Sequence, residues 1–288
     1  ATLGGNTAII GTGLWTLVSG GGTITTPTLE TSGLTSLTVG VNVFDWTISN
    51  GVCPSSSSTV SIQRDENPTV SNAGPSQSVC STSATMAGNP AAVGTGTWTL
   101  ISGSGTISFP NSDNTPITSL GLGTNVFQWA IGNGVCPNST STVAITSFTN
   151  PTPSVAGPNQ TICATATVLA ANTPTVGSGV WAVMAGPGVV TSPSSPNSGV
   201  TGLTPGLHIF QWSITNGVCP VSSSTVSIQV DPNPSPAVAG PNQTVCVSYA
   251  NLNATPPAIG TGSWTLVSGV GAIVSPASPT SSITGMPI

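Results

Sequence analysis

The chain has 288 residues and a formal net charge of −5, and charged side chains make up only 2% of it, against about 25% in an average soluble domain. With a single Lys or Arg, it lacks the basic clusters that neutralise nucleic-acid phosphates or bind acidic lipid headgroups. No apolar run approaches the ~20 residues of a membrane-spanning helix. Neither nucleic-acid binding nor direct membrane insertion is therefore expected.

An 83-residue repeat without insertions or deletions runs through the sequence. The motif "NVFDWTISNGVCP" at Asn42 returns as "NVFQWAIGNGVCP" at Asn125 and as "HIFQWSITNGVCP" at His208. Two series of Trp and two series of Cys keep the same spacing: Trp15, Trp98, Trp181 and Trp264; Trp46, Trp129 and Trp212; Cys53, Cys136 and Cys219; Cys80, Cys163 and Cys246. Self-similarity at a fixed period indicates tandem structural units.

Prolines mark the linkers between these units, because they follow a strand-like run and precede the repeated "AGP" motif. The predicted domains are residues 1–67, lacking their first strands; 68–150; 151–233; and 234–288, lacking their last strands. Two explanations of the incomplete ends stay open: truncation of a longer chain, or strand exchange between subunits.

Alternating apolar and polar residues predict the elements of each unit, here in chain order for the second. Trp98 and Leu100 alternate with Thr neighbours, and the later runs are Phe127–Trp129–Ile131 and Val143–Ile145. Period two is the pattern of a strand with one buried face. Asn133-Gly134, between the last two runs, predicts a type I′ hairpin turn. No segment has a helical period of sufficient length. The fold class is therefore all-β: tandem Ig-like β-sandwich repeats forming an extended rod.

The Trp residues are predicted to be core, one near the centre of each sheet of a repeat, because they alternate in phase with other apolar residues. This applies to Trp15, Trp46, Trp98, Trp129, Trp181, Trp212 and Trp264. His208 replaces an Asn of the other repeats and is predicted to be an exposed strand-edge residue.

Six cysteines at fixed spacing in a charge-poor, exported chain predict disulfides. Pairing within a repeat joins Cys80–Cys136 and Cys163–Cys219, each 56 residues apart, and leaves Cys53 and Cys246 to partners outside residues 1–288. Pairing across the linker joins Cys53–Cys80, Cys136–Cys163 and Cys219–Cys246, each 27 apart. The first choice is favoured, because the last strand of ~11 residues would separate the second set by roughly 35 Å.

No catalytic, cofactor or metal site is predicted, so the chain is not expected to be an enzyme. The six carboxylates do not recur at one position of every repeat, and the single His has no partner set. General acid–base catalysis requires a placed pair of titratable groups. No Cys-x-x-Cys spacing is present to suggest zinc.

The stretches "AGPNQTIC", "GTGTWTLISGSGTI" and "NVFQWAIGNGVCPNSTSTVAI" resemble the Ig-like or PKD-like repeats of giant Bacteroidota surface proteins, among them the gliding-motility adhesins. The resemblance covers essentially the whole chain and implies export by the type IX secretion system and a place on the cell surface or in an extracellular fibre.

The expected function is that of a structural shaft, since near-identical repeats favour a regular rod over one specialised site. Two alternatives stay open: a carbohydrate- or surface-binding adhesin module, and a subunit of a fibre assembled through strand edges. The expected partners are the neighbouring repeats of the same chain, with other filament subunits or surface glycans as further candidates.

Overall fold

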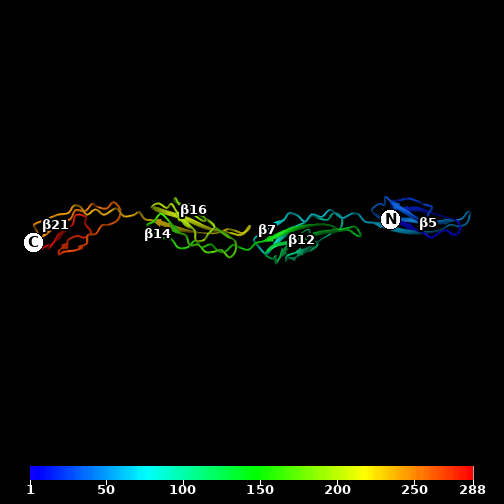
Figure 1. Cartoon of the computed structure of the whole chain (residues 1–288). Coiled ribbons are helices and arrows are strands. Elements are labelled where there is room, and N and C mark those ends of the chain that lie inside the picture. The colour runs from blue at the N-terminus through cyan, green and yellow to red at the C-terminus, as the bar shows by residue number, and fades with distance from the viewer. Residues whose placement is uncertain (288) are drawn as a thin grey trace. The chain divides into compact units, whose positions relative to one another are not determined.

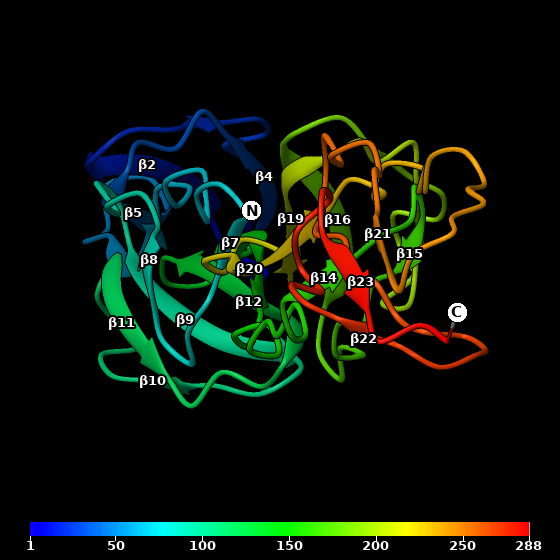
Figure 2. The ribbon, with the colours of Figure 1, turned by 90° about the vertical axis from the view of Figure 1, so that its left-hand side faces the viewer.

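The computed structural model describes residues 1–287, which form strands and turns and no helix. The chain divides into two compact units, Ala1–Thr149 and Asn150–Ile288, and several of their strands are labelled in Figures 1 and 2. Every sheet is built from strands of one 83-residue repeat. The prediction of all-β, tandem Ig-like β-sandwich repeats is confirmed.

The first unit contains two repeats, each with two sheets. The first repeat has the sheets β1(Thr2–Gly4)-β4(Thr31–Thr35)-β3(Thr23–Ile24) and β2(Thr12–Ser19)-β5(Gly40–Ser49)-β6(Ser56–Arg64). The second has β10(Thr106–Ile107)-β11(Asn114–Thr118)-β8(Ala84–Ala87) and β7(Gln77–Val79)-β13(Ser139–Ser147)-β12(Gly123–Gly132)-β9(Thr95–Ser102). All pairings are antiparallel except that of β7 with β13.

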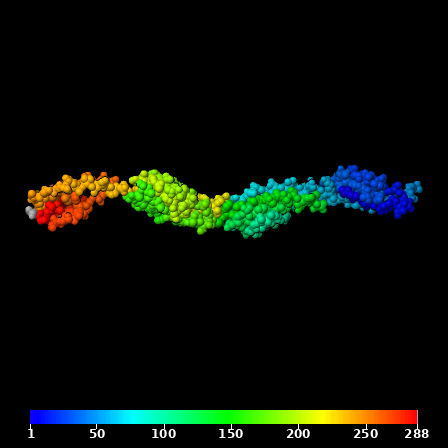
Figure 3. Space-filling model, in the orientation of Figure 1, coloured from blue at the N-terminus to red at the C-terminus, as the bar shows by residue number. Residues whose placement is uncertain are grey.

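The second unit repeats this plan and then departs from it. The third repeat has the sheets β15(Thr167–Val168)-β18(Gly199–Thr201)-β17(Val189–Val190) and β14(Gln160–Ile162)-β20(Ser222–Val230)-β19(Gly206–Thr215)-β16(Ser178–Ala185). The last has only β21(Tyr249–Asn251)-β23(Ser282–Thr284)-β22(Ala272–Ile273). It runs from orange to red in Figure 3. Residues 261–268, the counterpart of β16, are not a strand there, because residues 234–287 contain no counterpart of β19 to pair with.

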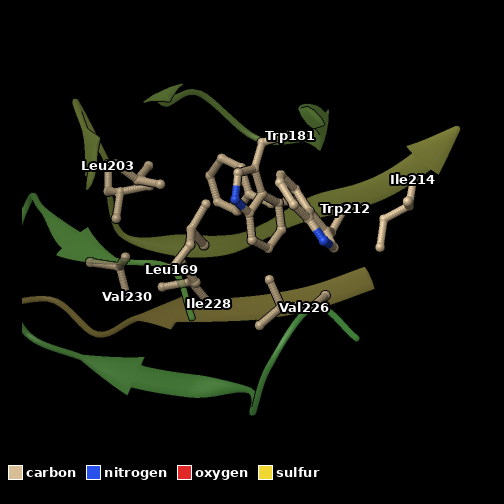
Figure 4. Packing of buried hydrophobic residues seen from close by; sticks show 11 residues of the cluster. Leu169, Trp181, Leu203, Trp212, Ile214, Val226, Ile228 and Val230 are labelled. Carbon is tan, nitrogen blue, oxygen red and sulfur yellow. The ribbon is translucent and has the colours of Figure 1, made fainter. Parts of the chain in front are cut away.

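Each of the cores in the first three repeats is centred on a pair of Trp side chains on adjacent strands of one sheet. Trp181 lies opposite Trp212 in the pairing of β16 with β19, and their ring centroids are 5.1 Å apart. The equivalent pairs Trp15–Trp46 and Trp98–Trp129 are both at 5.0 Å. Figure 4 shows the third core, in which Leu169 and Leu203 meet the Trp pair and Val226, Ile228 and Val230 of β20.

Two expectations about the Trp residues are wrong. The two Trp of a repeat share a sheet instead of occupying one sheet each, because both belong to strands that are direct neighbours. Six of the Trp are buried, but Trp264 is half-buried, because its repeat has no second sheet to cover it.

The hairpin turn after β12 is not type I′. Its closing hydrogen bond runs from the Cys136 N–H to the Asn133 oxygen, at 3.1 Å, so Gly134 and Val135 are its central residues. Gly134 has φ +54°, whereas Val135 is not among the residues with positive φ. A type I′ turn needs positive φ at both central positions, and a β-branched side chain strongly disfavours it.

Candidate functional site

Among residues 1–287, no three His, Cys, Asp or Glu lie close enough together to hold a metal ion. The same residues include no helix long and apolar enough to cross a membrane. The features of the chain that carry specific chemistry lie instead at the junctions between repeats and on one unpaired sheet edge.

At the junction within the first unit, the linker is bound by the turn that follows β12. The backbone N–H of Val135 donates to Asp65 Oδ2 at 3.1 Å, and Asn133 Nδ2 donates to the carbonyl oxygen of Glu66 at 2.8 Å. Cys136 Sγ lies 3.7 Å from the carbonyl oxygen of Asp65. The "NGVC" turn of the second repeat thus holds the residues that directly follow β6.

The junction within the second unit shows the other series of cysteines. Cys163 follows β14, whose parallel register with β20 places Ile162 opposite Val230. Its Sγ lies 3.5 Å from the carbonyl oxygen of Asp231 and 3.2 Å from Asn233 Oδ1. The end of the first strand of a repeat therefore contacts the linker that leaves the same repeat.

Both cysteine series meet at one position of the linker. Asp65 and Asp231 are two repeats apart (231 − 65 = 166) and are therefore equivalent. The turn cysteine of the following repeat and the strand-end cysteine of the preceding repeat each contact the carbonyl oxygen of this position. A disulfide between the two series is therefore the pairing that the local geometry favours.

Cys80, of the strand-end series, and Cys219, of the turn series, are each disulfide-bonded. Among the residues that the structure describes, Cys53, Cys136, Cys163 and Cys246 are free thiols.

The predicted pairs Cys80–Cys136 and Cys163–Cys219 are therefore wrong. The reason is that β7 runs parallel to β13 and pairs with its last residues, Val79 lying opposite Ser147. Cys80 lies beyond that end of β13, whereas Cys136 precedes its start. The nine residues of β13 span about 30 Å, far more than the ~4–7 Å between Cα atoms that a disulfide allows.

A second feature is the edge of β6. The sequence suggested assembly through strand edges but did not indicate which strand has an unpaired edge. The structure gives β13 and β20 a parallel neighbour, β7 and β14, but within residues 1–287 β6 pairs with β5 alone. Val60 on β6 is 39% exposed, whereas its counterparts Val143 and Val226 are 3% and 1% exposed. An apolar strand face thus lies open along β6.

His208 has a structural role and is 1% exposed, so the prediction of an exposed edge residue is wrong. Its counterpart Asn125 is also buried and donates from Nδ2 to the oxygens of Gly121 and Gly123, at 2.9 and 3.1 Å. The His208 Nε2 lies 2.7 Å from the oxygen of Thr204. This polar position joins the end of a loop to the sheet in each complete repeat.

No protein-family model matches the chain, and no match is found among curated proteins. Solved structures do match. The alignment with the human desmocollin-1 ectodomain has 10% identity and a TM-score of 0.29, and it covers 96% of this chain and 66% of the desmocollin chain. The alignment with Sidekick-1 immunoglobulin domains 1–5 has 13% identity and a TM-score of 0.41, and it covers 90% of this chain and 62% of the Sidekick-1 chain. The alignment with the insect immune protein hemolin has 12% identity and a TM-score of 0.33, and it covers 67% of this chain and 56% of the hemolin chain.

The chain covers less than two thirds of the length of each of these three structures. At such identities the likeness concerns the fold alone. The class of the protein therefore rests on its own sheets: it is a tandem array of Ig-like β-sandwich repeats.

Proposed function

We propose that the chain is a non-catalytic structural segment, the shaft of an extracellular surface adhesin or filament that presents or anchors distal binding regions. The domains of this shaft are residues 1–67, 68–150, 151–233 and 234–288. By the resemblance of its motifs, the protein is a cell-surface adhesin of the gliding-motility type, exported by type IX secretion.

The observation that carries this proposal is the binding of the linker by the next repeat. Three contacts fix Asp65 and Glu66 against the turn of the second repeat. A linker held in this way has little freedom to bend, which is the property that a shaft requires. Proline in the linker restricts it further.

The alternative of a carbohydrate-binding module would need exposed aromatic side chains, and the Trp residues of the first three repeats are not exposed. Six Trp side chains are buried in cores and are not available to stack on a sugar ring. We retain surface binding only as an outcome of the test below.

The test is to insert one further copy of residues 151–233 after residue 233 and to measure the maximum dimension by small-angle X-ray scattering. A shaft lengthens by a constant increment with each inserted copy, and its β-content per residue stays unchanged. An unchanged maximum dimension contradicts the proposal. Saturable binding of the chain to a glycan array would favour the carbohydrate-binding alternative, provided that substitution of loop residues abolishes this binding.

A further inference from the structure

The turn that follows β12 carries an Asn-Gly pair where it contacts the linker. Asn133 Nδ2 donates to the carbonyl oxygen of Glu66 at 2.8 Å. The N–H of Val135 donates to Asp65 Oδ2 at 3.1 Å. Both contacts lie within the first unit, between the linker that follows β6 and the complete second repeat. The Asn133 side chain therefore serves as a hydrogen-bond donor at this junction.

An Asn that precedes a Gly is open to attack by the next backbone nitrogen, because glycine has no Cβ to obstruct the approach. In this reaction the Gly134 nitrogen bonds to Asn133 Cγ and the Cγ–Nδ2 bond breaks. Nδ2 leaves as ammonia and takes the proton of the Gly134 N–H. Water then opens the succinimide ring to give aspartate or isoaspartate. The reaction consumes water and needs no oxidant, reductant or cofactor.

The intact junction opposes this reaction. The hydrogen bond to Glu66 fixes the Asn133 side chain on the linker, so ring closure has to break that bond first. The linker also packs directly on the turn, because a Cβ at Gly134 would collide with the Asp65 carboxylate. Among the residues that the structure describes, the Gly134 N–H makes no hydrogen bond. The attacking nitrogen is therefore ready to react once the linker detaches.

We propose that Asn133-Gly134 is a site of spontaneous deamidation that becomes reactive when the linker detaches from the turn, and that the reaction makes the detachment permanent. Detachment is a local opening, which needs less free energy than unfolding of the repeat. The chemical step does not depend on the proposed shaft. Its mechanical consequence, the loss of a stiff junction, rests on that function and is tested separately.

The product cannot restore the contact with the linker. An oxygen takes the place of Nδ2 and faces the Glu66 carbonyl oxygen with no proton to donate. The new carboxylate also lies close to that of Asp65, which packs against Gly134, so like charges repel across the junction. Where isoaspartate forms, the main chain gains an atom before Gly134, and the Val135 N–H is displaced from Asp65.

The first test removes the Asp65 contact from the full chain. The protein is aged in warm, mildly alkaline buffer, digested with a nonspecific protease and analysed by mass spectrometry. Asp65→Ala should raise the rate of deamidation at Asn133 about 5–10-fold, as expected for the loss of one hydrogen bond to a charged group. The rate at Asn216, which stands in the same "NGVCP" motif of the third repeat, should not change.

The matched control is Asp231→Ala, at the equivalent linker position two repeats later. It should leave the rate at Asn133 as it is in the wild type. Equal rates at Asn133 in the Asp65→Ala and Asp231→Ala chains overturn the proposal, because the linker would then not protect the site.

The second test measures whether the product keeps the junction open. The sequence has two Glu residues, Glu30 and Glu66, and a glutamyl endopeptidase cleaves at the carbonyl carbon of Glu. The Glu66 carbonyl is the one that Asn133 holds, so cleavage after Glu66 reports release of the linker. Asn133→Asp should speed this cleavage at least ~5-fold relative to Asn216→Asp, the same substitution in the third repeat.

Cleavage after Glu30 is the internal reference, because its carbonyl oxygen is hydrogen-bonded within the first repeat, to the Gly5 N–H and Trp15 Nε1. Equal cleavage after Glu66 in the two variants overturns the proposal. Faster cleavage after both Glu30 and Glu66 in the Asn133→Asp chain also overturns it, because the substitution would then loosen the repeat and not the junction. Neither result bears on the increase of length with inserted repeats, which tests the shaft.

Discussion

At the scale of single residues, a buried polar side chain organises each complete repeat. Asn125 is 1% exposed and accepts the Ser104 N–H on Oδ1 at 2.8 Å, while its Nδ2 donates to Gly121, Gly123 and Ile145. A buried amide whose hydrogen bonds are all made is stabilising, but removing it leaves its partners without theirs.

We therefore expect Asn125→Ala to lower the free energy of unfolding by about 2–4 kcal/mol, because it leaves a buried N–H and several carbonyl oxygens unpaired. Chemical denaturation followed by Trp fluorescence measures this. The control is Asn114→Ala on the exposed side of β11, which should change stability by less than ~0.5 kcal/mol. Equal effects of the two variants would contradict this role for Asn125.

The substitution of Asn by His in the third repeat is accompanied by a second substitution nearby. The residue equivalent to Ser104 is Pro187, which has no amide N–H to donate. An Asn at 208 would therefore keep an unpaired oxygen. The His208 Nδ1 also has no partner in the described structure, while Nε2 retains the bond to Thr204.

This predicts coupling between positions 187 and 208. In a chain that carries His208→Asn, adding Pro187→Ser should raise the stability by supplying the N–H that the Asn oxygen lacks. A double-mutant cycle in urea should give a favourable interaction energy of about 1 kcal/mol. Additive effects would show that the two positions are independent.

At the scale of elements, the Trp pair requires a glycine on the neighbouring strand. A Cβ on Gly96 would lie 2.0 Å from Trp129 Cζ2, and one on Gly179 would lie 2.1 Å from Trp212 Cζ2. The glycine on β9 or β16 leaves the space that the second indole ring occupies. The same sequence position in the last repeat is Gly262, where nothing lies within 4 Å.

Gly96→Ala should therefore destabilise its repeat by about 1–3 kcal/mol through overpacking, and Gly262→Ala should leave stability unchanged. Differential scanning calorimetry on the two variants compares the same substitution at equivalent positions of a complete and an incomplete sandwich. A cost at both positions would point to backbone propensity and not to the Trp contact.

At the scale of the whole molecule, Cys80 and Cys219 are each disulfide-bonded, and the second and third repeats, to which they belong, each have a core of their own. A disulfide stabilises mainly by restricting the unfolded chain, typically by about 2–4 kcal/mol.

The double variant Cys80→Ser/Cys219→Ser should accordingly lower the thermal unfolding midpoint of the second and third repeats while leaving far-UV circular dichroism unchanged. The matched variant Cys53→Ser/Cys246→Ser removes two thiols that are free in the structure. In reducing buffer it should unfold as the wild type does. An unchanged midpoint in the first variant would mean that the link carries no stability.

The sequence by itself determined the 83-residue repeat, the strands, the absence of a recurring catalytic set and the apolar face that carries the Trp residues. These follow from composition and from a period of two along the chain, both of which are local properties. The third repeat also differs from the second at two positions that are hydrogen-bonded to each other in the second, Pro187 for Ser104 and His208 for Asn125, and both differences are visible in the sequence.

Only the tertiary structure decided which strands are neighbours, in which direction they run and which cysteines meet. Alternation states which face of a strand is buried but not what lies beside it. The first strand of a repeat does neighbour the last, as sequence reasoning assumed, but it runs parallel to it and pairs with its far end. That single choice of direction moves Cys80 away from Cys136 by the length of a strand, so the predicted disulfide within the repeat does not form and Cys136 is a free thiol.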